Sequence, residues 1–481
     1  MKLTCISVLA LFSFAACVQP QTYMSNPEEH IVRKLSDQRI VMLADFAHEF
    51  PLPYHTLTST LSTWLTMLEK GESDQRRVTL FLEEDSRTAS LVRHYLETGD
   101  LDSLLDFVLP TTSLERLEFY SDLRRITARI DSMNAVRPSS QAISFNVQGP
   151  EAMNAFDPRL IDSSATASLL FFVRDRDSLT AMNIRAYLQN HPDQKGLIFY
   201  GAGHLIKNIV TKAFTQSLRP EERTGAFLAR YLKDEYGDSQ VFVVNQVWKG
   251  RSSLNLDQFG SKDVMILSGD VPWKESPPKD ENVDPRNFDA FIIRNEPAAS
   301  PHFLSHVFSK RIVTASIKRL RQMENHRSGE FGSRFYNQAL KGLTFLSDTS
   351  FLSPEDWNSW CSTYYFDGLA RLQSAEFRHR LANEFFQKRE VDLSYLQDLE
   401  DFGFGPRFGN PKTMSHDEWN KAFDRIWPEI VFVNAVGIYW VGDAKEVAQA
   451  KSYLVEASGQ NYDDAARYLK WWRQRFCGVD Y

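Results

Sequence analysis

The chain has 481 residues, of which 43% are hydrophobic and 13% aromatic, with 22 glycines and 20 prolines. This composition excludes a collagen-like or wholly disordered protein, and the length predicts roughly two or three folded domains. With a formal net charge of -7 and no run of five or more Lys and Arg residues, the chain is not expected to bind nucleic acid.

The first 17 residues have the features of a secretory signal that ends at a lipidation site. An apolar stretch leads to Phe14-Ala15-Ala16, which places two small residues directly before Cys17. We therefore predict a signal peptide over residues 1–17 and a lipid on Cys17. The alternative is an ordinary signal peptide with a different cleavage point, because Phe14 stands where a lipidation signal usually has Leu.

Residues 18–29 are expected to form a tether between this lipid and the folded chain. The longest later apolar stretch, 430–441, is shorter than the roughly 20 residues that a spanning helix needs, so only the lipid would hold the chain to a membrane. If the chain is a bacterial lipoprotein, Val18 after the cysteine favours the outer membrane. We therefore expect an exported protein of the cell envelope that faces the periplasm or the outside.

Short apolar runs after this segment predict buried strands, because the runs are continuous rather than alternating. They cover residues 39–44, 78–82, 168–173, 196–200, 240–244, 264–267 and 290–293. Helical periods lie between them, at Leu57-Leu61-Trp64-Leu65-Leu68, at Leu91-Val92-Tyr95-Leu96 and at Leu179-Asn183-Ala186-Tyr187. This alternation predicts a mainly parallel sheet with helices on both faces, an α/β domain over residues 30–300.

Beyond residue 301 the strand signals fade and amphipathic helices dominate. They are expected over residues 302–323, 331–346, 354–372, 377–387, 416–426, 445–457 and 463–476. We therefore predict an all-α domain over residues 301–481, with its many aromatic side chains in the core. Cys361 and Cys477 in this part would be either a disulfide pair or two buried thiols.

Charged and imidazole groups follow four successive candidate strands. They are Asp45-Phe-Ala-His48, Glu83-Glu84-Asp85, Arg174-Asp-Arg-Asp177 and Gly201-Ala-Gly-His204. Because parallel sheets bind ligands at the carboxyl ends of their strands, we expect these groups to share one crevice. For Asp85 and Asp177 the alternative is helix capping, since acidic residues are favoured at helix N-termini.

At these positions the sequence resembles the erythromycin esterase, ChaN and Tiki superfamily. The resemblance covers about residues 36–245 and rests on Leu43-Ala-Asp-Phe-Ala-His48-Glu-Phe50, Phe81-Leu-Glu-Glu84, Arg176-Asp-Ser-Leu-Thr-Ala-Met-Asn-Ile184 and Gly201-Ala-Gly-His204, in this order. Ala44, Asp45 and Thr180 stand where the family has Gly, Glu and Met. Asp45 keeps the charge of Glu but withdraws the carboxylate by one methylene, which puts catalytic activity in doubt.

The resemblance implies roles for the residues that match the family's motifs. His48 would be the general base or a metal ligand, Asp45 its acidic neighbour and His204 the second histidine. The second acid would be Glu83 or Glu84, which face opposite sides because they are neighbours on one strand, and Glu84 is favoured slightly.

Three functions are compatible with these residues. The first is hydrolysis of an ester or amide bond in a small-molecule or peptide substrate, with His48 activating water and with Arg176 and Asn183 as supporting polar residues. A divalent metal on His48, His204 and Glu84 would assist this reaction.

The other two functions need no hydrolysis. The resemblance to ChaN implies a haem- or iron-binding lipoprotein, for which Tyr54 and His55 are further candidate ligands beside the two site histidines. Alternatively, the chain is a scaffold that keeps the fold without catalysis and binds another envelope protein. The scaffold hypothesis predicts a large apolar patch on residues 301–481.

Overall fold

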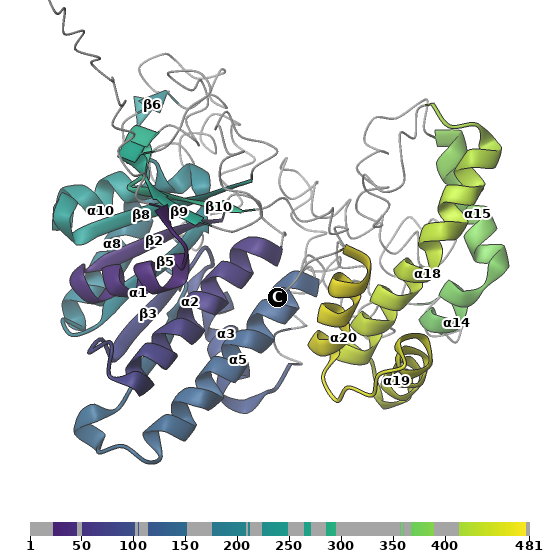
Figure 1. Cartoon of the computed structure of the whole chain (residues 1–481), viewed down its shortest axis with the longest axis horizontal. Helices are drawn as coiled ribbons and strands as arrows, with labels where there is room; N and C mark the ends of the chain where they lie inside the picture. Colours follow the sequence, from purple (N-terminus) through teal and green to yellow (C-terminus); the bar gives the residue numbers. More distant parts are fainter. Residues whose placement is uncertain are drawn as a thin grey trace, which may run out of the picture.

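Apolar runs in the first 300 residues form a sheet, and the last part of the chain forms helices. Figure 1 shows both parts in the computed structural model. The structure describes residues 23–45, 51–101, 104, 114–151, 176–207, 210–211, 224–248, 264–270, 285–294, 356, 359, 367–388 and 413–477. The strand expected over 168–173 and the helices expected over 302–323 and 331–346 lie outside these residues, as does the expected domain boundary at 300/301.

The main sheet has eight strands in the order β1-β9-β10-β8-β2-β5-β3-β4. They are β1 (Tyr23–Met24), β2 (Ile40–Asp45), β3 (Arg77–Leu82), β4 (Ser144–Gln148), β5 (Lys195–Gly201), β8 (Val241–Trp248), β9 (Val264–Leu267) and β10 (Ala290–Arg294). Neighbouring strands are parallel, except that β9 runs antiparallel to β1 and β10. The predicted mainly parallel sheet is confirmed. β6 (Val210–Thr211) and β7 (Thr224–Gly225) form a separate antiparallel pair.

Helices cover both faces of the sheet, because successive strand residues point to opposite sides and both sets are apolar. Val41 and Leu43 of β2 belong to the same core as Leu57 of α2, whereas Ile40 belongs to the core that contains Ile184 of α8. The first face carries α1 (Pro27–Asp37), α2 (Pro51–Lys70), α3 (Ser86–Thr98) and α5 (Leu114–Asn134), and the second carries α8 (Arg176–Asn190) and α10 (Leu228–Tyr236). Short 3-10 helices are η1 (Ser139–Gln141), η4 (Ala202–Leu205), η6 (Asp238–Gln240), η8 (Ser268–Asp270) and η9 (Pro285–Asn287).

Residues 23–29 belong to this fold, which corrects part of the tether expected over 18–29. β1 pairs with β9, and α1 begins at Pro27, where proline is favoured in the first turn of a helix. The helix then buries Ile31, Val32 and Leu35 against the sheet.

The prediction that Leu179, Asn183, Ala186 and Tyr187 mark the buried face of their helix is also wrong. α8 buries Ala181, Ile184 and Leu188, whereas Asn183 and Ala186 are exposed. The buried face differs from the expected one because two polar residues of the first two turns are buried with it. One of them, Asp177, belongs to the functional site.

The C-terminal part is helical, as predicted, and its core is rich in aromatic side chains. Its elements are α14 (Gly368–Gln373), α15 (Ala375–Lys388), α18 (His416–Val441), α19 (Ala444–Ser458), α20 (Ala465–Trp472) and a π-helical turn (Arg473–Cys477). Trp419, Trp427 and Trp472 are buried in one cluster. α18 begins with a capping box at Ser415 and continues through Pro428, so it is longer than predicted.

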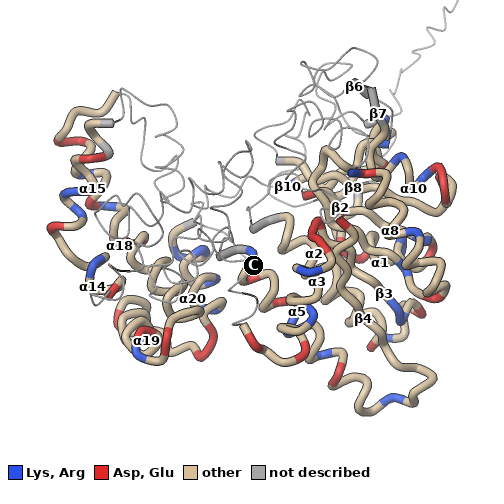
Figure 2. Tube along the Cα trace, turned by 180° about the vertical axis from the view of Figure 1, so that it is seen from behind, with Lys and Arg blue, Asp and Glu red and all other residues tan. Residues whose placement is uncertain are grey.

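Acidic and basic residues are intermixed over both parts, as Figure 2 shows. Among the described helices, none is long and apolar enough to cross a membrane. Large hydrophobic side chains that are exposed in the described residues are Val136, Met182 and Phe476. Of these three, Phe476 lies in the helical part, and the apolar patch expected over residues 301–481 stays a prediction because most of residues 301–366 and 389–412 lie outside the described residues.

Candidate functional site

A polar site lies where β2, β3 and β5 end. The parallel register places Asp45 of β2 beside Gly201 of β5, and Leu82 of β3 beside Phe199. Residues that follow these strands therefore meet at one edge of the sheet, where α/β sheets bind ligands.

Arg176 is the centre of one network at this edge. It begins α8, and its Nε donates to Glu151 Oε2 at 2.8 Å. Its Nη2 donates to Glu83 Oε1 at 2.8 Å, and its Nη1 lies 3.2 Å from His204 Nε2. A single guanidinium thus joins two carboxylates and an imidazole, because its planar fork presents donors in several directions.

The imidazole of His204 is fixed from its other side by Asp177. His204 Nδ1 lies 2.6 Å from Asp177 Oδ1, and Asp177 Oδ2 accepts a hydrogen bond from the Leu228 amide at 3.2 Å. The side chain of Asp177 is only 3% exposed and that of His204 19% exposed. Because the carboxylate accepts a hydrogen bond from Nδ1–H, the proton stays on Nδ1 and the lone pair is on Nε2.

Burial and charge act in opposite directions on these groups. Burial by itself would lower the pKa of His204, but the charge and hydrogen bond of Asp177, helped by Glu83, raise that pKa above its ordinary value. For Glu151, burial raises the pKa although the Arg176 guanidinium opposes the rise. The imidazole is therefore a stronger base than an isolated histidine, despite its burial.

Glu83 and Glu84 face opposite sides of the sheet edge. Glu83 accepts from Arg176 and, through Oε2, from the Gly201 amide at 2.7 Å. Glu84 Oε1 lies 3.5 Å from Arg116 Nη1 of α5. Glu83, rather than the slightly favoured Glu84, is therefore the acid beside His204. Whether Glu84 lies beside His48 stays a prediction, because His48 lies outside the described residues.

The side of Glu84 holds a second network of polar groups. The Tyr120 hydroxyl lies 3.5 Å from Glu84 Oε1, and the Tyr54 hydroxyl is hydrogen-bonded to Arg116. Burial raises the pKa of Glu84, and the Arg116 charge opposes that rise. Asp45 is 5% exposed at the end of β2, and its charge acts on Tyr54.

The other predicted residues have varied outcomes. His48 lies outside the described residues, so a crevice shared by His48 and His204 stays a prediction. Asn183 is exposed and donates to the Pro150 carbonyl at 2.8 Å, away from the imidazole network. Asp85 is the N-cap of α3 and accepts from the Thr88 amide, as the capping alternative predicts.

Of the predicted metal ligands, His204 and Glu84 are not placed to share a metal ion, and His48 lies outside the described residues. His204 has Asp177 at one ring nitrogen and the Arg176 guanidinium at the other, where a positive charge would repel a cation. Glu84 faces the opposite side of the edge. Among the described residues, no group of three or more His, Cys, Asp and Glu side chains could hold a metal ion.

Of the proposed haem ligands, Tyr54 does not fit ligation as it is placed, and haem binding stays a prediction. Tyr54 stacks on Phe119, with ring centroids 4.9 Å apart, and burial raises the pKa of its hydroxyl, which opposes the tyrosinate that iron binds. His55 is half-buried, and burial lowers its pKa to about 4, which keeps its ring in the neutral form that binds a metal.

Glu151 was not predicted from the sequence, and Asp177 was expected either in the polar cluster, as found, or as a helix cap. Glu151 follows β4, an edge strand with alternating polar residues that gives no continuous apolar run. The Gly-Pro pair directly before Glu151 is a turn signal that could have marked the end of this strand. Asp177 was visible as an acid two residues before a helical period, but its partner is 27 residues away.

Comparisons with known proteins show structural likeness at low identity. No family model and no curated protein matches the sequence. Among solved structures, a mutant of the erythromycin esterase EreC in its open conformation aligns over 55% of this chain and 92% of its own, with 14% identity and a TM-score of 0.35. A Bacillus cereus protein (56% and 92%, 12% identity, TM-score 0.34) and the type III effector HopBA1 (56% and 94%, 12% identity, TM-score 0.30) are also similar. The structural neighbours of the chain thus include an erythromycin esterase, from the superfamily that its motifs resemble.

Proposed function

We propose that the protein hydrolyses an ester or amide bond with water that His204 activates. The observation that carries this proposal is the position of the imidazole between Asp177 and Arg176 at the carboxyl end of β5. A carboxylate on Nδ1 orients an imidazole as a general base, and a neighbouring guanidinium can stabilise the oxyanion of acyl transfer.

The reaction follows from the placement of these groups. Asp177 holds the proton on Nδ1, so Nε2 takes a proton from water while the water oxygen adds to the carbonyl carbon. The Arg176 guanidinium stabilises the negative oxygen that forms. The imidazolium then returns the proton to the leaving alcohol or amine, and the acid product is released.

Arg176 also controls when Nε2 is available as a base. Its Nη1 lies 3.2 Å from Nε2, so the guanidinium is hydrogen-bonded to the imidazole before substrate binds. A substrate carbonyl oxygen that takes this hydrogen bond frees Nε2 for water. Glu83 and Glu151 hold the guanidinium in place during the exchange, because each has a separate 2.8 Å bond to it.

Two buried polar atoms near this network support a site for a polar ligand. Glu151 Oε1 and the Tyr200 hydroxyl are buried and have no hydrogen-bond partner among the described residues. The charges of Glu151 and Glu83 act on the Tyr200 hydroxyl, and burial raises its pKa. Buried polar atoms are normally satisfied, so a bound water or substrate group is the expected partner.

The test compares His204→Ala with the parent on a panel of esters and amides. We expect a loss of kcat of about 10²- to 10⁴-fold, the usual contribution of a general base. His94→Ala is the matched control, because His94 is an exposed histidine whose ring lies 3.6 Å from Asp100. Equal rates for His204→Ala and the parent on every substrate that the parent cleaves would refute the proposal.

We also propose that the protein is exported and anchored in the cell envelope by a lipid on Cys17. The support is the small-residue site before Cys17 in the sequence. Growth with a labelled fatty acid should label the parent chain and leave Cys17→Ala unlabelled. Label in both chains, or in neither, would contradict lipidation at this residue.

A further inference from the structure

One turn of α5 connects the sheet edge with the helical part of the chain. Arg116 reaches Glu84 at the sheet edge, with 3.5 Å between Nη1 and Oε1. The next residue, Leu117, is buried in the core cluster of the C-terminal helices. Glu118 then forms an ion pair and hydrogen bond with Arg473 of the π-helical turn. Three consecutive residues thus contact the site, the helical core and the C-terminal turn.

Further ion pairs extend this contact along α5. Residues later in α5 pair with residues earlier in the C-terminal segment, so the two segments run antiparallel. Glu118 meets Arg473, and Arg125, two turns later on α5, lies 3.2 Å from Asp464 at the start of α20. Between them, burial and Glu118 raise the pKa of Asp122, whereas Lys470 and Arg125 oppose that rise. Opposite charges therefore face each other in one register, which fixes how α20 lies along α5.

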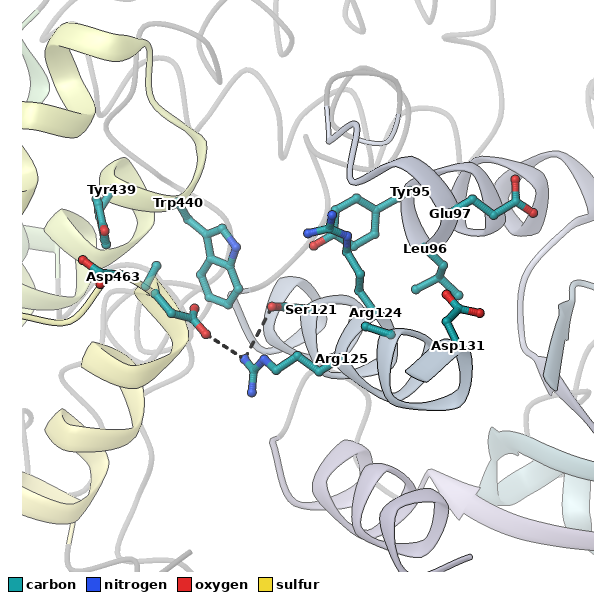
Figure 3. A pocket seen from close by; sticks show the side chains of 13 residues that line it. Tyr95, Leu96, Glu97, Ser121, Arg124, Arg125, Asp131, Tyr439, Trp440 and Asp463 are labelled. Atoms are coloured by element: carbon teal, nitrogen blue, oxygen red, sulfur yellow. Dashed lines mark hydrogen bonds and ion pairs between the residues drawn. The ribbon is translucent and has the colours of Figure 1, made fainter. Parts of the chain in front are cut away.

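The inner pair of this contact, Arg473 and Glu118, is buried, and the outer pair, Arg125 and Asp464, is exposed to solvent. The side chains of Arg473 and Glu118 are 1% and 8% exposed, whereas those of Arg125 and Asp464 are 45% and 36% exposed. The outer pair borders a cavity of about 600 Å³ between the two parts of the chain, where Trp440 faces α5 (Figure 3). Water screens an exposed pair, but a buried charge that loses its partner is costly, so the inner pair dominates.

We propose that Arg473 is a positioning residue for the site at the sheet edge. It holds Glu118, and thereby the turn of α5 that presents Arg116 to Glu84. Glu84 directly follows Glu83, which binds Arg176 and the Gly201 amide in the catalytic network. The inference rests on the proposed function for its catalytic consequence, but the placement of the sheet edge can be measured without any substrate.

Hydrogen exchange of the full chain, read by mass spectrometry, tests the placement. Arg473→Gln should speed exchange about tenfold or more in peptides 114–123 and 80–90, because an unpaired buried Glu118 opens the contact. Arg475→Gln is the matched control, since Arg475 lies in the same turn and is exposed. Faster exchange in 114–123 with unchanged exchange in 80–90 would show that Arg473 only joins the two parts, and would overturn the proposal.

A second variant separates positioning from folding. Glu118→Gln combined with Arg473→Gln removes both charges and leaves none buried alone, so the double variant should unfold at nearly the urea concentration of the parent. We expect it still to show faster exchange in 80–90, because two neutral side chains no longer tie the turn of α5 to the C-terminal turn as the ion pair does. Parent-like exchange there in the folded double variant would overturn the proposal even if Arg473→Gln alone does not fold.

The catalytic consequence has its own measurement. With a substrate that the parent cleaves, Arg473→Gln or the double variant should lower kcat about tenfold and leave KM within about twofold, because the base is misplaced and the binding groups remain. Unchanged kcat together with faster exchange in 80–90 would overturn the catalytic part of the inference. If the parent cleaves nothing, the proposed function fails and the exchange result still decides whether Arg473 positions the edge.

Discussion

Glu83 and Glu84 are consecutive residues with the same functional group, but they belong to two different regions of the sheet edge. On the α8 side, Glu83 binds Arg176 beside the imidazole of His204. On the α5 side, Glu84 lies near Arg116, a pair that is longer and more exposed than the Arg176 pairs.

The two sides of the sheet edge are built from different parts of the molecule. The α8 side takes its cation and its carboxylate from consecutive residues, Arg176 and Asp177, at the start of one helix, and its imidazole from the end of the neighbouring strand. The α5 side takes Arg116 from a helix that also contacts the C-terminal helices. The described α/β residues therefore assemble the acid–base groups, and the helical part adjusts the opposite side.

The comparison predicts that the strongest loss of activity comes from the α8 side. Asp177→Asn should lower kcat by about 10³-fold or more, because an amide no longer fixes the proton on Nδ1 or stabilises the imidazolium. The matched control is Asp100→Asn, which changes the acid of the exposed pair with His94 and should leave kcat unchanged. An active Asp177→Asn variant, measured with a substrate of the parent, would move the catalytic groups away from this side.

The two arginines should differ in their effect on stability. Arg176→Gln leaves Glu151, whose side chain is 2% exposed, without a cation and should cost about 3 kcal/mol of unfolding free energy at pH 7. Arg116→Gln should cost less, about 2 kcal/mol, because its pair with Glu84 is longer, although the variant also loses the hydrogen bond to Tyr54.

Urea unfolding at two pH values sharpens this comparison. Burial already raises the pKa of Glu151, so its protonated form is favoured in the folded chain once the cation is gone. The deficit of Arg176→Gln should therefore shrink as the pH falls toward 5 and grow as it rises. Equal costs for both arginine variants at pH 7 would contradict a tighter α8 side.

The titration of His204 gives a smaller effect with a defined sign. Since its folded pKa is raised, the stability that the imidazolium gains from Asp177 is present below the unfolded pKa and is lost as pH rises through the folded pKa. Activity has the opposite trend, because the base must be neutral, so kcat/KM should rise with pH through that same pKa.

Imidazole signals in histidine-labelled protein measure this pKa directly. The parent should titrate His204 above the ordinary value near 6.5, and Asp177→Asn should bring it below, because burial remains when the carboxylate charge is gone. A pKa of His204 that does not change between the two proteins would show that Asp177 does not set the charge of the ring.

The sequence predicted the sheet well because buried strands leave continuous apolar runs. β2, β3 and β5 lie where such runs occur, so Asp45, Glu83 and His204, which end or follow them, lie at the expected edge. The edge strand β4 was missed, and Glu151 with it, because a half-covered strand alternates polar and apolar residues.

The strands alone do not predict on which side of the sheet edge each carboxylate lies. Because side chains alternate along a strand, Glu83 and Glu84 are expected to point to opposite sides. Which of them lies beside His204 depends on the helix that supplies the arginine. Arg116 is 60 residues before Arg176 in the sequence, and neither position carries a local signal of the carboxylate that it pairs with. Such long-range pairs depend on how helices pack across the sheet, which periodicity does not encode.

Asp85 directly follows Glu83 and Glu84 in the sequence, and its substitution should have the smallest effect on stability and activity. It caps α3 by accepting from the Thr88 amide at 2.7 Å, and it contacts neither arginine network in the hydrogen bonds and ion pairs of the described residues. Asp85→Ala should therefore cost about 1 kcal/mol in urea unfolding, the usual value of a lost N-cap, and leave kcat unchanged. Asp85→Asn is the control, because asparagine also caps helices. A loss of kcat in Asp85→Ala that Asp85→Asn shares would show that the charge of Asp85, rather than its cap, serves the site. The side that each acid faces would then not determine its role.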